Sequence, residues 1–466
     1  MTLLAATVPL QAQSPVPQVR TYDLDVTFQP DQAGMDAQAH ITFQPLQSVP
    51  DSLVFYLHGE LSVDSIVWDG ASVPFAEEKV FYYFDYSLIA TRVVLEVAGR
   101  SLSSGLSVFY GGYINPSRAR SPSDYMRVDA TGVLLRGYAY SPWFPIFLES
   151  RESSYAVSFP SVTIRTPREL RTVFIGTKLD EREEEDRRVT RWRAHDVDLL
   201  EVQCSALRWR VTSRGDVHAY HNSTESSRRA ATNLLDYGER LAALFRSYFR
   251  SDAVAPDVFF MEMPRFGEIS SGNVVGLTTS GWRAFEQVDL TNEAVVHAIG
   301  TIAHELVHSF VRFPMDFSDP LWTFMIEGFP SYFYKPVLAE LIGEEYYRSS
   351  LRRSERIYLR NREQAGEGGI PPEKPLLEIT AEEISLYKDR FVLGDRGSLF
   401  FNYLRTRMGS DRFLEFAHDL FSMDTLDVEG LEATILTYLP NAREDVRTWL
   451  MTTEYPERFQ LETLWP

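Results

Sequence analysis

The chain has 466 residues, of which 44% are hydrophobic and 13% aromatic, enough apolar material for two or three packed domains. A formal net charge of −19 without a basic stripe excludes nucleic-acid binding driven by electrostatics. Cys204 is the single cysteine of the sequence, which excludes a disulfide framework and a metal site built from cysteines.

Residues 1–14 resemble the end of a secretory signal. An apolar run over residues 3–10 is followed by QAQ at 11–13, similar to the small-residue pattern of a cleavage site. The positive residues that begin such signals are missing, so a disordered N-terminus is the alternative. We therefore predict an exported protein, periplasmic or secreted, with a cytoplasmic protein as the alternative. No later run is long and apolar enough to predict a transmembrane segment.

Residues 15–212 are predicted to form a β domain. Apolar and polar residues alternate in TYDLDVTFQ and AQAHITFQP, and strand-like runs continue with Gly, Pro, Asp and Ser between them. This density of strands favours an antiparallel β-sandwich or a saddle-shaped sheet. The charge run at 181–193 indicates a solvated hairpin tip. The aromatic, proline-rich segment 138–147 either seals the core between domains or forms one wall of a substrate cleft.

Residues 213–345 are predicted to form an α+β catalytic domain, and residues 346–466 its helical C-terminal part. Helical spacing of apolar residues begins at 224–250, and β-stretches follow before a long helix at 292–311. The later segments read mostly as helices, interrupted by a loop rich in glycine and proline.

The predicted helix 292–311 carries the pattern H-E-x-x-H in His304, Glu305 and His308. Residues four apart lie on one helix face, so the two imidazoles can bind one metal ion, with Glu305 beside them to take a proton from water bound to the metal. A catalytic zinc requires a third protein ligand, and Glu327 is the candidate, 18 residues (309–326) beyond His308. The alternative is an amphipathic helix whose histidines are satisfied in the core.

The pattern HELVH, 18 residues, then Glu327 within IEGFPSYF resembles the aminopeptidase N family of gluzincins. The similarity extends to MPRFGEISSGNVVGL, which resembles the exopeptidase strand of that family, and to RGSLFFNYLRTRMGSDRFLEF with WLMTTEYPERF, which resemble the helical close of its catalytic region. The resemblance implies a thermolysin-like catalytic domain, without the large C-terminal helical domain of the family. Matched by motif, His304, His308 and Glu327 would hold one zinc ion per chain, and Glu305 would be the general base.

Two positions depart from the family pattern. The family's amine-binding Glu falls on Asn273, beside Gly272, and Glu268 is the nearby carboxylate that remains as a candidate. The family's oxyanion-stabilising Tyr falls on Gly394. Tyr387, seven residues earlier, is the candidate for that role, with ordinary packing as the alternative.

We therefore predict a zinc metallopeptidase that acts on peptide or protein substrates, is aminopeptidase-like, and uses attack of zinc-bound water assisted by Glu305. Losing one oxyanion donor slows turnover by about 100- to 1000-fold, which leaves slow hydrolysis possible. One alternative is an endopeptidase or other amide hydrolase that does not read the N-terminus. The other is a catalytically weak, zinc-stabilised peptide-binding protein. Glu305 favours an enzyme, because a purely structural zinc site has no need of this carboxylate.

Overall fold

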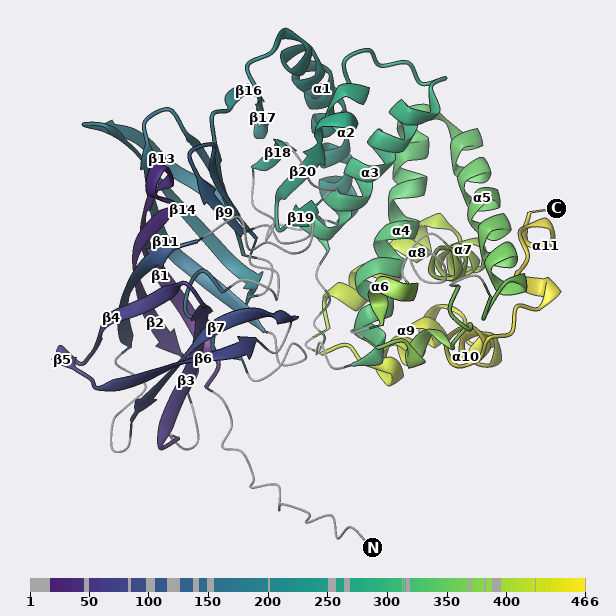
Figure 1. Ribbon diagram of the computed structural model, residues 1–466. Helices are drawn as coiled ribbons and strands as arrows, with labels where there is room; N and C mark the ends of the chain where they lie inside the picture. Colours follow the sequence, from purple (N-terminus) through teal and green to yellow (C-terminus); the bar gives the residue numbers. More distant parts are fainter. Residues whose placement is uncertain are drawn as a thin grey trace, which may run out of the picture.

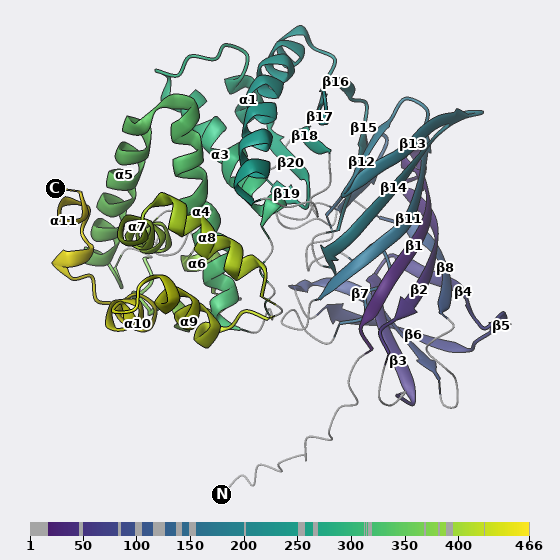
Figure 2. The same ribbon diagram turned by 180° about the vertical axis from the view of Figure 1, so that it is seen from behind.

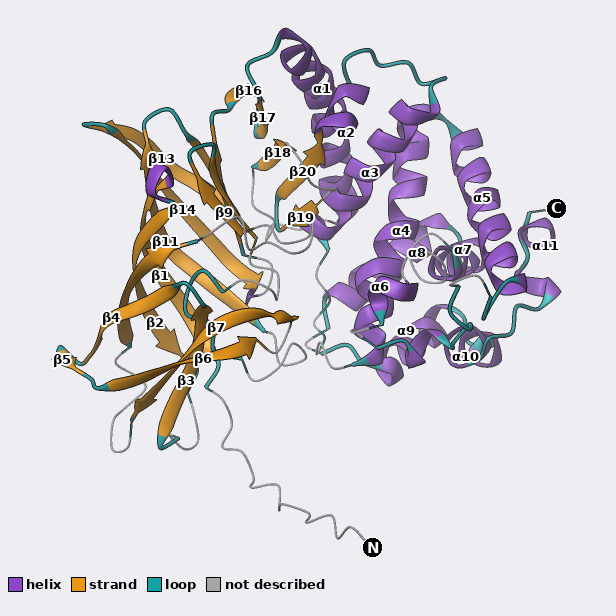
Figure 3. Cartoon of the chain, in the orientation of Figure 1, coloured by secondary structure: helices purple, strands orange, loops and turns teal. Residues whose placement is uncertain are grey.

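A β-rich N-terminal part and a helical C-terminal part lie on either side of a small mixed sheet in the computed structural model (Figures 1 and 3). The structure describes residues 17–465 except for 46–49, 83–84, 98–104, 115–125, 137–141, 149–154, 200–201, 250–256, 264–268, 312, 314, 316–318, 368–369, 381–382, 388–394 and 424. Residues 1–14 lie outside this description, so the export signal remains a prediction. Among the described residues, no helix has the length and hydropathy needed to cross a membrane.

The N-terminal part is built on an eight-stranded sheet. Its order is β13 (Thr177–Glu184), β14 (Arg187–Asp198), β11 (Ala156–Pro167), β1 (Val19–Gln29), β2 (Gly34–Phe43), β8 (Leu106–Tyr113), β4 (Leu61–Trp68) and β5 (Ala71–Ser72). The predicted alternation in β1 sends every second side chain inward, and Tyr22, Leu24, Val26 and Phe28 are buried. The sheet is antiparallel except that β1 pairs in parallel with β11.

Two smaller sheets share one hydrophobic core with the large sheet. One contains β3 (Ser52–His58), β7 (Asp85–Glu96) and β6 (Phe75–Tyr82), and the other contains β12 (Arg171–Phe174), β15 (Gln203–Leu207), β10 (Gly132–Arg136) and β9 (Met126–Asp129). A 3₁₀ turn, η1 (Pro30–Gln32), joins β1 to β2. The charge run at 181–193 is confirmed as a hairpin, formed by β13 and β14.

The aromatic segment predicted as a core seal or a cleft wall closes the β core wherever it is described. Residues 142–148 are all buried. Ile146 exchanges two backbone hydrogen bonds with Tyr56 of β3, at 3.0 and 3.1 Å, and the Tyr22 hydroxyl donates to the Pro145 carbonyl over 2.7 Å. These contacts favour the role of a core seal. Residues 138–141 lie outside the described part of the chain.

The second domain begins with a five-stranded sheet in the order β16 (Arg210–Arg214), β17 (Val217–His221), β18 (Val258–Met263), β20 (Val274–Thr278) and β19 (Ile269–Ser271). β17, β18 and β20 are parallel, and β16 and β19 are antiparallel edge strands. Both faces of the central strands β18 and β20 are buried, as in parallel sheets generally, whereas the edge strand β16 is largely exposed. In β18, Phe259 and Met261 belong to the core of the β domain, whereas Val258 and Phe260 belong to the core of the helical part.

Helices cover the other face of this sheet (Figures 1 and 2). They are α1 (Glu225–Phe249), α2 (Thr279–Ala284), α3 (Glu293–Phe310), α4 (Pro320–Ile342), α5 (Glu344–Glu363), α6 (Ile384–Tyr387), α7 (Arg396–Met408), α8 (Ser410–Phe421), α9 (Val428–Tyr438), α10 (Arg443–Met451) and α11 (Leu461–Leu464), with 3₁₀ turns η6 (Leu376–Glu378) and η8 (Glu457–Phe459). The predicted class, a β domain followed by an α+β domain and a helical part, is confirmed.

Candidate metal centre

Helix α3 presents the H-E-x-x-H residues on one face because its other face is apolar. Its N-terminus is capped by Asn292, whose Oδ1 accepts a hydrogen bond from the Ala294 backbone over 2.9 Å. The apolar residues Ile299, Ile302, Ala303, Leu306 and Val307 are buried against the core. The helix is thereby held with His304, Glu305 and His308 half-buried on the opposite side.

Helix α4 brings the third acidic residue back to α3. Its first turn is fixed by Asp319, which accepts a hydrogen bond from the Leu321 backbone over 2.7 Å, and by Pro320, which favours the first helical position. Phe324 and Phe329 of α4 are fully buried on either side of Glu327 in sequence. They anchor the helix, so that the Glu327 carboxylate faces the two histidines.

His304, His308 and Glu327 form one cluster of potential ligand atoms. The two Nε2 atoms are 3.2 Å apart, and Glu327 Oε2 lies 3.7 Å from the Nε2 of His304 and 3.8 Å from that of His308. Two atoms bound about 2.1 Å from one tetrahedral ion would be about 3.4 Å apart, so the spacing fits zinc. In the described part of the chain, this is the one group of three or more such residues.

The cluster is accessible to small molecules. The side chains are 17% exposed for both histidines and 22% exposed for Glu327. Glu305 follows His304 directly on α3 and is half-buried. Three potential ligands with an accessible side are compatible with a catalytic zinc site, whereas structural sites are closed by a fourth protein ligand.

Tyr387, predicted as an oxyanion donor, is engaged elsewhere in the structure. Its side chain is 2% exposed, and its hydroxyl donates to the Pro372 carbonyl over 3.0 Å. Burial raises the pKa of its phenol, which therefore stays protonated at neutral pH. These contacts favour the packing role over a contact with substrate. Gly394, the position matched to the family's tyrosine, lies outside the described residues.

Asn273 is a contact between the two domains. Its Oδ1 accepts from the Gly176 backbone over 2.7 Å, and its Nδ2 donates to the carbonyls of Gly176 and Asp257 over 2.8 and 2.6 Å. The side chain is only 4% exposed, so these bonds occupy it fully. Gly272 precedes it in the turn between β19 and β20, with φ +53°, a conformation that favours glycine. The predicted contact of Asn273 with a substrate amine receives no support, and Glu268 lies outside the described part.

Tyr334 touches the cluster directly, although it is not among the site residues predicted from the sequence. Its ring meets that of His304 edge-on, with centroids 6.0 Å apart and planes at 75°. A usable signal is present, because Tyr334 follows Glu327 by seven residues, two helical turns, and therefore lies on the same face of α4. Helix α4 contains many aromatic residues, so the sequence alone does not distinguish Tyr334 from those that pack in the core.

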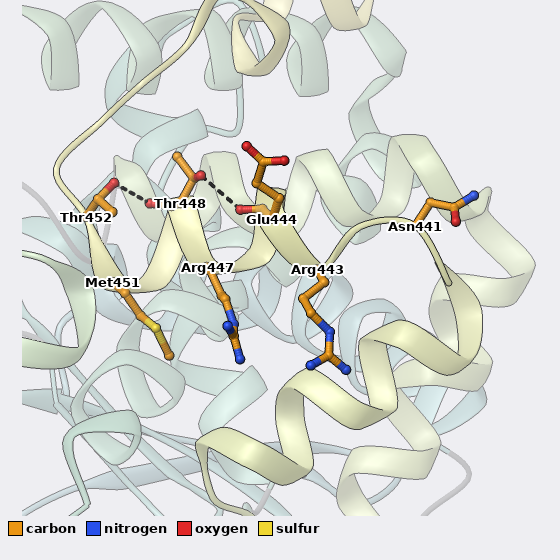
Figure 4. Close-up of a pocket in the computed structure, with 7 residues that line it drawn as sticks. All are labelled: Asn441, Arg443, Glu444, Arg447, Thr448, Met451 and Thr452. Carbon is orange, nitrogen blue, oxygen red and sulfur yellow. Dashed lines mark hydrogen bonds between the residues drawn. The ribbon is translucent and has the colours of Figure 1, made fainter.

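The hollow shown in Figure 4 is a separate feature on α10. It has a volume of about 540 Å³, and none of its lining residues belongs to α3 or α4. Arg443 and Arg447 extend from one side of the helix, and both pair with Glu432 of α9, at 3.4 and 3.3 Å. The two arginines share this one carboxylate, and the hollow contains none of the residues of the α3–α4 cluster.

The fold is similar to that of known zinc metallopeptidases. An M1 zinc metallopeptidase from Deinococcus radiodurans superposes with a TM-score of 0.70 at 16% identity, over 96% of this chain and 97% of that one. A mutant of the same protein bound to a Tyr-Ser-Ala substrate gives 0.68 at 17% identity, over 96% of each chain. Native yeast LTA4 hydrolase gives 0.69 at 15% identity, over 98% of this chain and 73% of that one. No protein-family model matches the sequence, and no curated protein matches it.

Proposed function

We propose that this protein is a zinc-dependent peptidase. The observation that carries the proposal is the cluster of His304, His308 and Glu327, with spacing suited to one zinc ion, an accessible side and Glu305 next to a ligand. The similarity in fold to M1 zinc metallopeptidases over nearly the whole chain supports the same class of chemistry. One zinc ion per chain follows from one such cluster among the described residues.

The proposed division of labour assigns each residue one task. His304, His308 and Glu327 hold the ion, and bound zinc supplies a Lewis acid that makes water more acidic and polarises a carbonyl. Glu305 accepts the proton of the attacking water and returns it to the departing amine. The buried apolar face of α3 keeps Glu305 and the two histidines in register, so the reacting groups are positioned before substrate arrives.

We propose short peptides as substrates, with an aminopeptidase-like preference. Structures with similar folds include an M1 peptidase mutant bound to Tyr-Ser-Ala and a two-domain M1 peptidase mutant bound to L-arginine. Recognition of a free amino terminus requires an accessible carboxylate, because a desolvated ammonium needs an opposite charge. Asn273 is occupied by backbone groups, so this task falls to another residue, with Glu268 as the candidate.

The occupied side chain of Asn273 favours one second candidate, an endopeptidase that does not read the amino terminus. The two candidates differ in where they cut. The test is metal analysis of the purified protein, combined with product mapping on a peptide library in which each peptide is present with a free and with an acetylated N-terminus.

We expect one zinc per chain and removal of single residues from the free peptides only. Cleavage of both forms at internal bonds would establish the endopeptidase instead. A protein that holds zinc, binds peptides and cleaves neither form would contradict the peptidase proposal and leave the peptide-binding alternative. Glu305→Gln is the matched control, because it separates zinc content from turnover.

A further inference from the structure

We propose that Tyr334 is a positioning residue for the metal ligand His304, a role that rests on the proposed zinc site. The ring of Tyr334 contacts the imidazole edge-on, with centroids 6.0 Å apart. The contact joins the two helices that carry the ligands, since His304 lies on α3 and Tyr334 on α4, two turns beyond Glu327. A ring in this position restricts how far the imidazole can rotate.

The polar contacts of His304 do not by themselves fix the orientation of its imidazole ring. Among the described residues, the imidazole makes its polar contacts through Nε2, with His308 and with Glu327. In most zinc sites, the second ring nitrogen of a histidine ligand donates to a carboxylate or carbonyl, which fixes the orientation of the ring. For His304, the described part of the protein provides an aromatic edge instead.

Tyr334 is itself immobilised, as a positioning residue must be. Its Cε2 atom and the hydroxyl oxygen of Tyr346 on α5 both lie against Gly300 of α3. A tyrosine whose ring packs against both His304 and Gly300 retains little rotational freedom.

The tyrosine pair also supports the backbone beneath the ligand. Gly300 lies one turn before His304 on α3, and a Cβ atom there would be 3.4 Å from the Tyr346 hydroxyl oxygen and 3.5 Å from Cε2 of Tyr334. Helix α3 therefore packs directly on the pair, close to the position of its first ligand. The brace formed by Tyr334 and Tyr346 thus fixes both the backbone and the side chain of the ligand-bearing turn.

A fixed ligand binds metal more tightly than a mobile one, because less conformational freedom is lost on binding. Removing the ring in Tyr334→Ala should therefore weaken metal binding by about 10- to 100-fold, the usual effect of altering the outer shell of a zinc site. Tyr334→Phe keeps the ring and should keep most of the affinity. Tyr334→Leu fills the space without an aromatic edge and serves if the alanine variant folds poorly.

Tyr332→Ala is the matched control. Tyr332 is a fully buried tyrosine of the same helix, but its ring contacts Phe401 and Phe413 rather than His304. Removing it should destabilise the fold to a similar degree without disturbing the ligand. The readouts are the zinc dissociation constant, measured by competition with a chelator, and the visible absorption spectrum of the cobalt-substituted protein, which reports ligand geometry.

The expected result is weaker zinc binding and an altered cobalt spectrum in Tyr334→Ala and Tyr334→Leu, with both unchanged in Tyr332→Ala. Equal effects of Tyr334→Ala and Tyr332→Ala, or no effect of either Tyr334 variant, would overturn the brace while leaving the zinc site intact. A wild-type protein that binds neither cobalt nor zinc at the cluster would overturn the proposed function itself, and the role of the brace with it.

Discussion

Glu305 and Asn273 show how differently two polar residues near one helix can be used. Glu305 is half-buried and follows His304 on α3, whereas the side chain of Asn273 is almost fully enclosed by backbone groups of two domains. Only the first is accessible enough for the catalytic role proposed above. The second is placed to hold the turn between β19 and β20 against the β domain.

Glu305→Gln should abolish most peptidase activity and leave zinc binding unchanged. The amide keeps the size of the side chain but cannot accept a proton from water, and loss of a general base lowers turnover by about 100- to 10,000-fold. Zinc content per chain and initial rates on a free peptide measure the two effects. A variant that loses zinc as well as activity would assign Glu305 to the ligand set instead.

Asn273→Asp should destabilise the protein without creating a preference for free amino termini. The carboxylate cannot donate to the carbonyls of Gly176 and Asp257, and leaving it buried among acceptors should lower the free energy of unfolding by about 3 kcal/mol. Urea unfolding measures the loss, and Asn441→Asp, at an exposed position, is the control. An increased ratio of free to acetylated peptide cleavage would contradict the structural role.

The cluster of His304, His308 and Glu327 was predictable because its arrangement is mostly local. Two histidines four residues apart need only a helix, and Glu327 needs only a turn that returns the chain on a second helix. The roles of Asn273 and Tyr334 depend on distant partners. Asn273 bonds to Gly176, 97 residues earlier, and Tyr334 reaches His304 only because α3 and α4 cross at that point.

Helix α4 joins the metal centre to the helical part through a buried lysine. Lys335 lies two turns beyond Glu327 and is 3% exposed. Its ammonium group donates to the Ser331 carbonyl and, over 3.0 Å, to the Ser398 hydroxyl on α7. Burial lowers the pKa of Lys335 to about 7, and the charge of Asp395 offsets part of this effect.

The stability of the α4–α7 contact should therefore depend on pH. An unfolded lysine has a pKa of about 10.4, so between pH 7 and pH 10 the unfolded chain binds more protons at this position than the folded one. The free energy of unfolding then rises with pH across this window, by up to about 1.4 kcal/mol per pH unit. Below pH 7 both states are protonated and the dependence disappears.

Lys335→Met removes this dependence and should be more stable than the wild type at pH 7, with the advantage shrinking by pH 9. Urea unfolding of both proteins at the two pH values measures the difference. Lys374→Met is the control, since Lys374 is a half-buried lysine whose ammonium is paired with Glu383. An advantage of Lys335→Met that stays constant with pH would show that Lys335 keeps its proton throughout.

The two domains share the central sheet, and this connects metal binding to the stability of the whole chain. One face of β18 and β20 completes the β core, and the other completes the helical core that supports α3 and α4. A ligand that binds only the folded state stabilises it, by about 4 kcal/mol when present at 1,000 times its dissociation constant. Zinc should therefore stabilise both halves together.

Removing zinc with a chelator should lower the melting temperature of the wild type as a single transition and leave that of His304→Ala unchanged. Differential scanning calorimetry with and without the chelator tests both statements. Two separate transitions, together with a change in limited proteolysis that is confined to the helical half, would show that the halves unfold independently. An equal shift in His304→Ala would place the responding metal outside the cluster.

The sheet that is buried on both sides also limits how this protein can be divided or recombined. Phe259, Met261 and Val274 belong to the core of a domain that precedes them in the chain. The helical half expressed alone would expose these apolar side chains to water, as a surface prone to aggregation. Exchange of the β domain between related proteins would succeed only if the donor surface matches this face of the sheet. The contact between the two halves therefore has to be kept intact. A library of chimeras should place its crossover points within surface loops of either half, away from β17, β18 and β20.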